Sequence, residues 1–172
     1  MGEHRPRLLL ITSEWTAPVP RAPARPNPPG ALKRQAEALQ AAGLWVEIFA
    51  FRGRTAYNYA AAWTQLRPRL RPERYDLVHA QDTSNVLLTL PKRVPLVVTV
   101  HRWDSPRLQE QLLARFLARR ADAMIVASDE MRARVGTSAP VHVIPPDLDE
   151  PALAAWLVDV YRSVASDCFS AS

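Results

Sequence analysis

Polar side chains that can take part in acid–base chemistry stand at the ends of short apolar runs in this sequence. The residues of this kind are Glu14, His79, His101 and Asp104. Two carboxylates such as Glu14 and Asp104 can work as general acid and general base when a fold brings them together. Carboxylates on solvated loops give the same pattern, so both interpretations of this pair stay open. The elements that position these residues must therefore be predicted first.

Short apolar runs alternate along the chain with segments of helical spacing. The runs, each typical of a buried strand, cover residues 8–12, 45–51, 76–80, 95–100, 123–127 and 141–144. The helical segments cover residues 30–42, 57–70 with a break at Pro68, 84–90, 107–120, 128–135 and 151–164. This alternation predicts an α/β fold, a single Rossmann-like doubly wound parallel sheet of about six strands with helices on both faces. Right-handed crossovers favour a strand order close to 2-1-3-4-5-6.

Two of the expected helices carry an apolar face. In the segment 107–120 the face consists of Leu108, Leu112, Leu113, Phe116 and Leu117. In the segment 151–164 it consists of Leu153, Trp156, Leu157, Val160, Tyr161 and Val164. Apolar residues three and four positions apart line one side of a helix, so both segments are predicted to be amphipathic. Residues 17–29, by contrast, hold so many prolines that a Pro-rich loop is expected there.

The carboxyl ends of parallel strands meet at one edge of the sheet. Ligands bind at that edge, near the point where the strand order reverses. The reversal is predicted between the strands at 8–12 and 76–80. The polar residues expected at this edge are Ser13, Glu14, Trp15, His79, Gln81, His101, Arg102, Asp104 and Ser128.

Composition excludes several classes of protein. The single cysteine, Cys168, rules out a disulfide scaffold and a multi-cysteine zinc site, and no His, Cys and Asp residues have metal-ligand spacing. The net charge of +5 is spread over several elements without a recognised motif, which argues against nucleic acid as a partner. No apolar run approaches the roughly 18 residues of a membrane span, and the run 8–11 is too short for a signal-peptide core. A cytoplasmic protein is therefore expected.

Six blocks of sequence follow one another with a specific order and spacing. They are RLLLITSEW, PPGALKRQAEALQAAGLWVEIFAF, YDLVHAQ, VPLVVTVHRWD, RRADAMIVAS and VHVIPP. Together they resemble the N-terminal half of a GT-B glycosyltransferase of family 4. The resemblance implies a Rossmann-like, acceptor-binding domain over residues 7–146. It further implies sugar transfer from a nucleotide sugar, as co-substrate, to a sugar acceptor that is lipid-linked in some members, without another cofactor.

The end of the chain resembles a different part of the same family. The junction between the two family domains usually reads like IPNGVD, and residues 144–149 here read IPPDLD. After this junction the chain leaves no room for a donor-binding domain of typical size. Residues 150–166 instead resemble the last helix of the family, which returns to the N-terminal domain. We therefore expect a first domain joined directly to the return helix, and a separate donor-binding domain as a partner.

The resemblance also assigns roles to single residues. His101 matches a family histidine that contacts the transferred sugar, so the catalytic role is assigned to it. The residues assigned to the acceptor and the cleft are Glu14, Trp15, His79, Gln81, Arg102 and Asp104. Gly30 stands where the family commonly has a Gly-Gly turn that approaches the donor phosphates. The preceding Pro28 and Pro29 lack N–H groups, which removes phosphate donors from this turn.

Alternatives stay open for the histidines, the basic clusters and the function. His101 and His79 can also be polar residues that only close their strands. The basic clusters are Arg67, Arg69, Arg71 and Arg74, then Lys92 and Arg93, then Arg115, Arg119 and Arg120. They suit either solvated helix faces or contact with an anionic membrane, which would place the protein at the inner face of the membrane. The competing function is a non-catalytic or engineered single-domain scaffold. A third alternative is a response-regulator-like or flavodoxin-like module. It is weaker, because the sequence lacks the acidic pocket of the first and the phosphate loop of the second.

Overall fold

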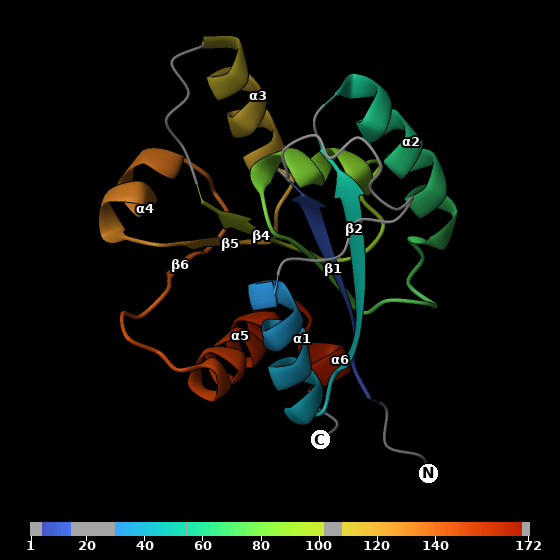
Figure 1. Cartoon of the computed structure of the whole chain (residues 1–172). Helices are drawn as coiled ribbons and strands as arrows, with labels where there is room; N and C mark the ends of the chain where they lie inside the picture. Colours follow the sequence, from blue (N-terminus) through green and yellow to red (C-terminus); the bar gives the residue numbers. More distant parts are fainter. Residues whose placement is uncertain (1–4, 15–29, 54, 102–107, 170–172) are drawn as a thin grey trace.

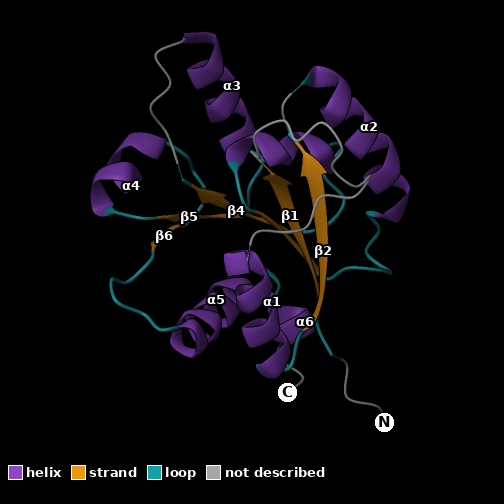
Figure 2. Cartoon of the chain, in the orientation of Figure 1, coloured by secondary structure: helices purple, strands orange, loops and turns teal. Residues whose placement is uncertain are grey.

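A single parallel sheet forms the centre of the molecule. The computed structural model describes residues 5–14, 30–53, 55–101 and 108–169. Its strands are β1 (Arg7–Glu14), β2 (Trp45–Arg52), β3 (Leu77–Ala80), β4 (Leu96–Val100), β5 (Ala123–Val126) and β6 (Val141–Val143). They pair in the order β2-β1-β3-β4-β5-β6, all parallel (Figures 1 and 2). The predicted α/β class and strand order are confirmed.

Helices cover both faces of this sheet. One face is covered by α1 (Gly30–Ala41), α5 (Glu150–Val164) and α6 (Ser166–Phe169). The other is covered by α2 (Ala56–Leu66), the 3-10 helices η1 (Arg67–Arg69) and η2 (Thr83–Thr89), α3 (Leu108–Ala118) and α4 (Asp129–Val135). Strand β1 contributes side chains to both layers. Leu8 and Leu10 pack on the side of α1 and α5, and Leu9 and Ile11 pack on the side of α2. This alternation is what a strand buried on two sides requires.

Helix α5 is tied into the fold along its length. Asp149 caps its first turn by accepting a hydrogen bond from the Ala152 amide at 2.8 Å. Its apolar side packs beside α1 on the sheet (Figure 1). At the surface, Arg34 of α1 pairs with Glu150 at 2.5 Å. The Pro-rich loop predicted at 17–29 lies outside the described residues. The assignment of residues 150–166 as a return helix and the domain boundaries 7–146 stay predictions.

Among the side chains that the structure describes, the amphipathic face predicted for residues 107–120 is buried at its carboxyl end and exposed before it. Leu117 is 1% exposed, whereas Leu112, Leu113 and Phe116 are 56%, 46% and 47% exposed. Helix α3 packs against η2, and Leu117 and Ala118 in its last turn join the core. Leu112, Leu113 and Phe116 lie on the surface. Among the described residues, no helix is both long and apolar enough to cross a membrane.

Gly53, just after β2, lies against the end of β1. A Cβ atom built on Gly53 would lie 2.5 Å from Ser13 Cβ and 3.2 Å from Tyr59 Oη. Ser13 Cβ is attached to the strand backbone and cannot rotate away. The first of these distances is far below normal carbon–carbon contact, so any side chain here must displace the strand.

The Gly53→Ala substitution is accordingly expected to lower the free energy of unfolding by about 1–3 kcal/mol, as overpacked sites do. Urea unfolding measures this change. Gly30→Ala is the matched control, because among the described residues a Cβ on Gly30 meets only the Arg34 guanidinium, at 3.8 Å. That control should be neutral or slightly stabilising, since alanine has the better helix propensity. Equal effects at the two glycines would contradict this account.

Candidate functional site

The strand order reverses at β1, whose neighbours β2 and β3 come later in the sequence. The carboxyl ends of β1 and β3 are joined there through the Ile11 carbonyl. This oxygen accepts hydrogen bonds from the backbone N–H of Gln81 at 2.9 Å and from Asn85 Nδ2 at 3.3 Å. The edge predicted to bind a ligand is therefore a well-defined part of the fold. Gln81 is the first residue after β3, in the connection to η2.

The predicted site residues occupy different positions at this edge. His101 directly follows β4 and is exposed, and Gln81 directly follows β3 and is half-buried. Glu14 ends β1, where its backbone pairs with that of Arg52. Trp15, Arg102 and Asp104 lie outside the described residues. The roles assigned to all of these residues stay predictions.

His79 lies inside the protein, with 1% of its surface exposed. Its Nδ1 is 2.7 Å from the Tyr161 hydroxyl of α5, and its Nε2 is 2.7 Å from Thr99 Oγ1 of β4. Burial lowers the pKa of His79 to about 3, with a smaller contribution from the nearby His101. His79 is therefore neutral near pH 7, and its two short hydrogen bonds are with core residues. A direct role in acceptor binding would require it to become exposed.

Gly30, predicted in the donor-phosphate turn, is the first residue of α1 and is exposed. The N–H groups of a first helical turn have no partner within the helix and can bind anions. The prolines before it lie outside the described residues. Its role in phosphate binding stays a prediction.

A hydrogen-bonded chain at the same edge was not predicted. Tyr59 Oη donates to Ser84 Oγ at 2.8 Å, and Ser84 Oγ donates to Asp82 Oδ1 at 2.7 Å. Burial is the main cause that raises the pKa of Tyr59, so its hydroxyl remains a donor at neutral pH. Asp82 also caps η2 by accepting from the Ser84 amide at 2.8 Å. The sequence Asp-Thr-Ser after an apolar strand is a capping signal that could have identified Asp82.

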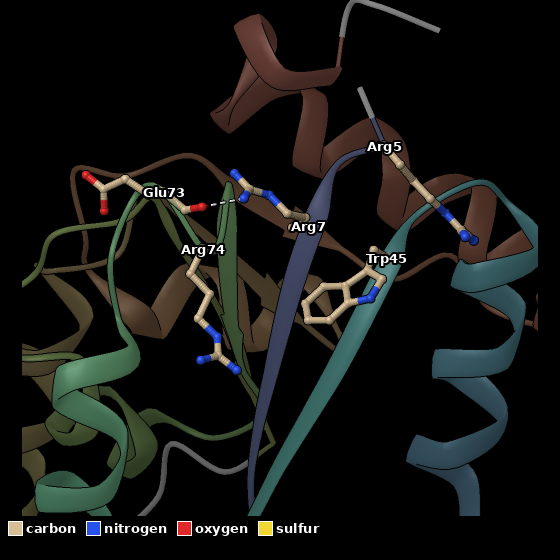
Figure 3. A pocket seen from close by; sticks show the side chains of 5 residues that line it. All are labelled: Arg5, Arg7, Trp45, Glu73 and Arg74. Atoms are coloured by element: carbon tan, nitrogen blue, oxygen red, sulfur yellow. Dashed lines mark hydrogen bonds between the residues drawn. The ribbon is translucent and has the colours of Figure 1, made fainter. Parts of the chain in front are cut away.

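A shallow pocket of about 590 Å³ lies at the opposite end of the sheet (Figure 3). It is lined by Arg5, Arg7, Trp45, Glu73 and Arg74, near the starts of β1 and β2. Arg7 is held there by Asp76 and by the Glu73 carbonyl. Arg5 donates to the carbonyls of Gln40 and Gly43 at the end of α1. These arginines therefore support the fold, and the pocket is separate from the carboxyl edge.

The carboxyl edge thus offers an imidazole, amides and hydroxyls. Such groups suit a ligand rich in hydroxyls, because each can donate or accept one hydrogen bond. Among the described residues, no group of three or more His, Cys, Asp or Glu side chains could hold a metal ion.

The sequence matches the family model of Glycosyltransferase Family 4 over residues 22–150. This match spans most of the chain. The chain belongs to glycosyltransferase family 4. The family agrees with the resemblance found in the sequence blocks and with the Rossmann-like sheet.

Solved structures share the fold of this family 4 chain. A structure of sucrose-phosphate synthase from Thermosynechococcus elongatus matches with a TM-score of 0.67 at 16% identity, covering 91% of this chain and 98% of that one. HepE from Anabaena, in complex with UDP and glucose, matches with a TM-score of 0.51 at 20% identity. That match covers 83% of this chain but 45% of HepE. No curated protein sequence matches the chain.

Proposed function

We propose that this chain is the acceptor-binding part of a sugar transferase that uses a nucleotide sugar. The observation that carries the proposal is the family 4 match over residues 22–150. The polar carboxyl edge around Gln81 and His101 is the proposed acceptor wall. The donor is bound by a separate donor-binding domain, and His101 contacts the transferred sugar. HepE, which shares the fold, has been solved with UDP and glucose, which supports a sugar ligand.

Reconstitution tests this function directly. The chain is mixed with a donor-binding domain of the family, and transfer from a panel of nucleotide sugars to sugar acceptors is followed. The wild-type chain is expected to support transfer, and His101→Ala is expected to abolish it without changing the melting temperature. The matched control His142→Ala removes a histidine from β6, away from the switch point, and should retain activity. Transfer that survives in His101→Ala would reject the role of His101.

The competing function is a non-catalytic scaffold with the same fold. The prolines before Gly30 favour it, because they remove N–H groups that a diphosphate would use. A scaffold would bind neither sugar acceptors nor a donor-binding domain, so the reconstitution separates the two hypotheses.

Nucleotide sugars are expected to bind the chain by itself with a dissociation constant no tighter than about 1 mM, or ~ −4 kcal/mol. The acceptor-side domain forms only one side of the expected cleft, so it cannot hold both the nucleotide and the sugar of the donor. The net charge of +5 attracts diphosphates only diffusely and is screened within roughly 8 Å at physiological salt. Isothermal titration at low and high salt measures this affinity. Micromolar, salt-insensitive binding that His101→Ala abolishes would instead indicate a minimal transferase.

A contact between α3 and an anionic membrane is a second part of the proposal. Leu112, Leu113 and Phe116 form the α3 face, an exposed apolar strip. Arg115 lies in the last turn of α3, and Arg119 and Arg120 directly follow the helix. The Arg120 guanidinium lies over the Phe116 ring, 4.9 Å from its centroid, and none of the three arginines has a carboxylate partner within the described part of the chain. Apolar side chains flanked by arginines whose charge no carboxylate neutralises suit a surface of anionic lipids. The same positive charges would repel a second copy of this face.

Phe116→Ala is expected to weaken binding to vesicles containing phosphatidylglycerol by at least tenfold, or about 1.4 kcal/mol. Vesicle co-sedimentation measures the change. The control Tyr57→Ala removes an aromatic ring that is 79% exposed on α2 and should leave binding unchanged. Equal loss in both variants, or no binding by the wild type, would contradict a membrane contact through α3.

A further inference from the structure

Three elements meet at the buried ring of His79. The ring belongs to β3, Thr99 to β4 and Tyr161 to the helix α5. A fourth group, the side-chain amide of Gln81, places its Nε2 3.4 Å from His79 Nδ1. Gln81 is half-buried at the carboxyl edge, whereas Tyr161 is fully buried under the sheet. His79 therefore links the helix at the end of the chain to a residue of the candidate site.

The contacts determine which nitrogen of His79 carries the proton. Burial raises the pKa of Tyr161, so its hydroxyl stays protonated, and the only hydrogen-bond partner it has among the described residues is His79 Nδ1. A buried hydroxyl that cannot donate is costly, so Tyr161 donates to Nδ1. The Gln81 side-chain nitrogen, which can only donate, approaches the same Nδ1 at the longer distance of 3.4 Å and shares its one lone pair with Tyr161. Nδ1 must then be unprotonated, and Nε2–H donates to Thr99 Oγ1.

The same arrangement fixes the orientation of the Gln81 amide. With the amide nitrogen turned toward His79 Nδ1, the carbonyl oxygen Oε1 is the other end of the group. Oε1 has no hydrogen-bond partner among the described residues. It is also absent from the side-chain atoms that are fully buried without a partner, so it is not enclosed by those residues. Within the described part of the chain, Oε1 is therefore left to accept a hydrogen bond from a ligand. An amide held in this way accepts hydrogen bonds and so selects a ligand that donates them.

We propose that Tyr161 is a positioning residue for the acceptor side, acting through His79 to hold the Gln81 amide with its carbonyl oxygen toward the ligand. The proposal rests on the proposed function in one respect, that the ligand is a hydroxyl-bearing sugar acceptor. The group that Gln81 recognises is then a hydroxyl that donates to Oε1. Helix α5 has a role in specificity beyond covering the sheet.

Nuclear magnetic resonance of the ¹⁵N-labelled chain tests this arrangement without any sugar. The wild type is expected to show His79 as a single Nε2–H tautomer at pH 7. It should also show nuclear Overhauser contacts between the Gln81 amide protons and the His79 ring. In Tyr161→Phe, a fraction of the Nδ1–H tautomer should appear and the Gln81 amide signals should shift. Tyr75→Phe is the matched control, a buried tyrosine whose hydroxyl donates to Glu47 and whose loss should leave His79 unchanged.

Gln81→Glu provides an independent variant if Tyr161→Phe does not fold. A carboxylate in place of the amide can only accept, so it should draw the proton to Nδ1. An Nδ1–H tautomer in the wild type, or unchanged His79 signals in both variants, would overturn the proposal. So would equal changes in the Tyr75→Phe control. Because no sugar is present, failure of the reconstituted transfer would leave this result standing and would reject only the identity of the ligand.

Discussion

Replacing Leu157 by alanine is expected to lower the free energy of unfolding by about 2–5 kcal/mol, the usual cost of removing a buried leucine side chain. Leu157 lies in the middle of α5 with 2% of its surface exposed, in the cluster that joins α5 to α1 and the sheet. Truncation removes apolar contacts and leaves a cavity, because the strands on the other side of the cluster cannot collapse into it. Urea unfolding followed by circular dichroism measures the change.

Leu112→Ala is the matched control for this prediction. It makes the same substitution in a helix, at a side chain that is 56% exposed on α3. Its effect should stay within about 0.5 kcal/mol, as for most surface substitutions. A similar loss in both variants would mean that helix propensity, and not docking of α5, sets the result. No loss in Leu157→Ala would mean that α5 does not dock on the sheet in solution.

Lowering the pH from 7 to 5 is expected to reduce the free energy of unfolding by about 2 kcal/mol through His79 alone. Its pKa is about 3 in the folded protein and near 6.5 when unfolded. Between these two pH values His79 is protonated in the unfolded chain and neutral in the folded protein. The stability due to the neutral ring is therefore fully present above pH 6.5 and is lost as the pH falls toward 3. Burial and Arg132 also lower the pKa of His142, which adds to the loss in the same direction.

Unfolding by urea at several pH values measures this dependence. His79→Gln should flatten the slope between pH 7 and 5 even if it destabilises the protein at every pH. His101→Gln serves as the control, because His101 is exposed and its removal should leave most of the slope in place. A slope that persists in His79→Gln would show that the ring is accessible to protons in the folded state.

Local pattern was enough to predict the backbone architecture. The apolar runs at 8–12 and 95–100 became β1 and β4, because continuous apolar side chains can be buried only where a strand is covered on two faces. The helix expected at 30–42 ends as α1 at Ala41, with Gly43 at a φ of +95°, a conformation that glycine adopts without strain. The carboxyl edge with Gln81 and His101 follows from strand direction. The family followed from the order of the blocks.

The environment of single side chains was decided only by the tertiary structure. His79 and His101 both end apolar runs, yet one is buried and the other exposed, because α5 brings Tyr161 over the first from 82 residues away along the chain. The apolar positions of α3 and α5 follow the same helical spacing, yet only α5 is covered along its length. Spacing determines which side of a helix is apolar. Whether that side meets the core depends on long-range packing, which the hydrophobic periodicity of one segment does not determine.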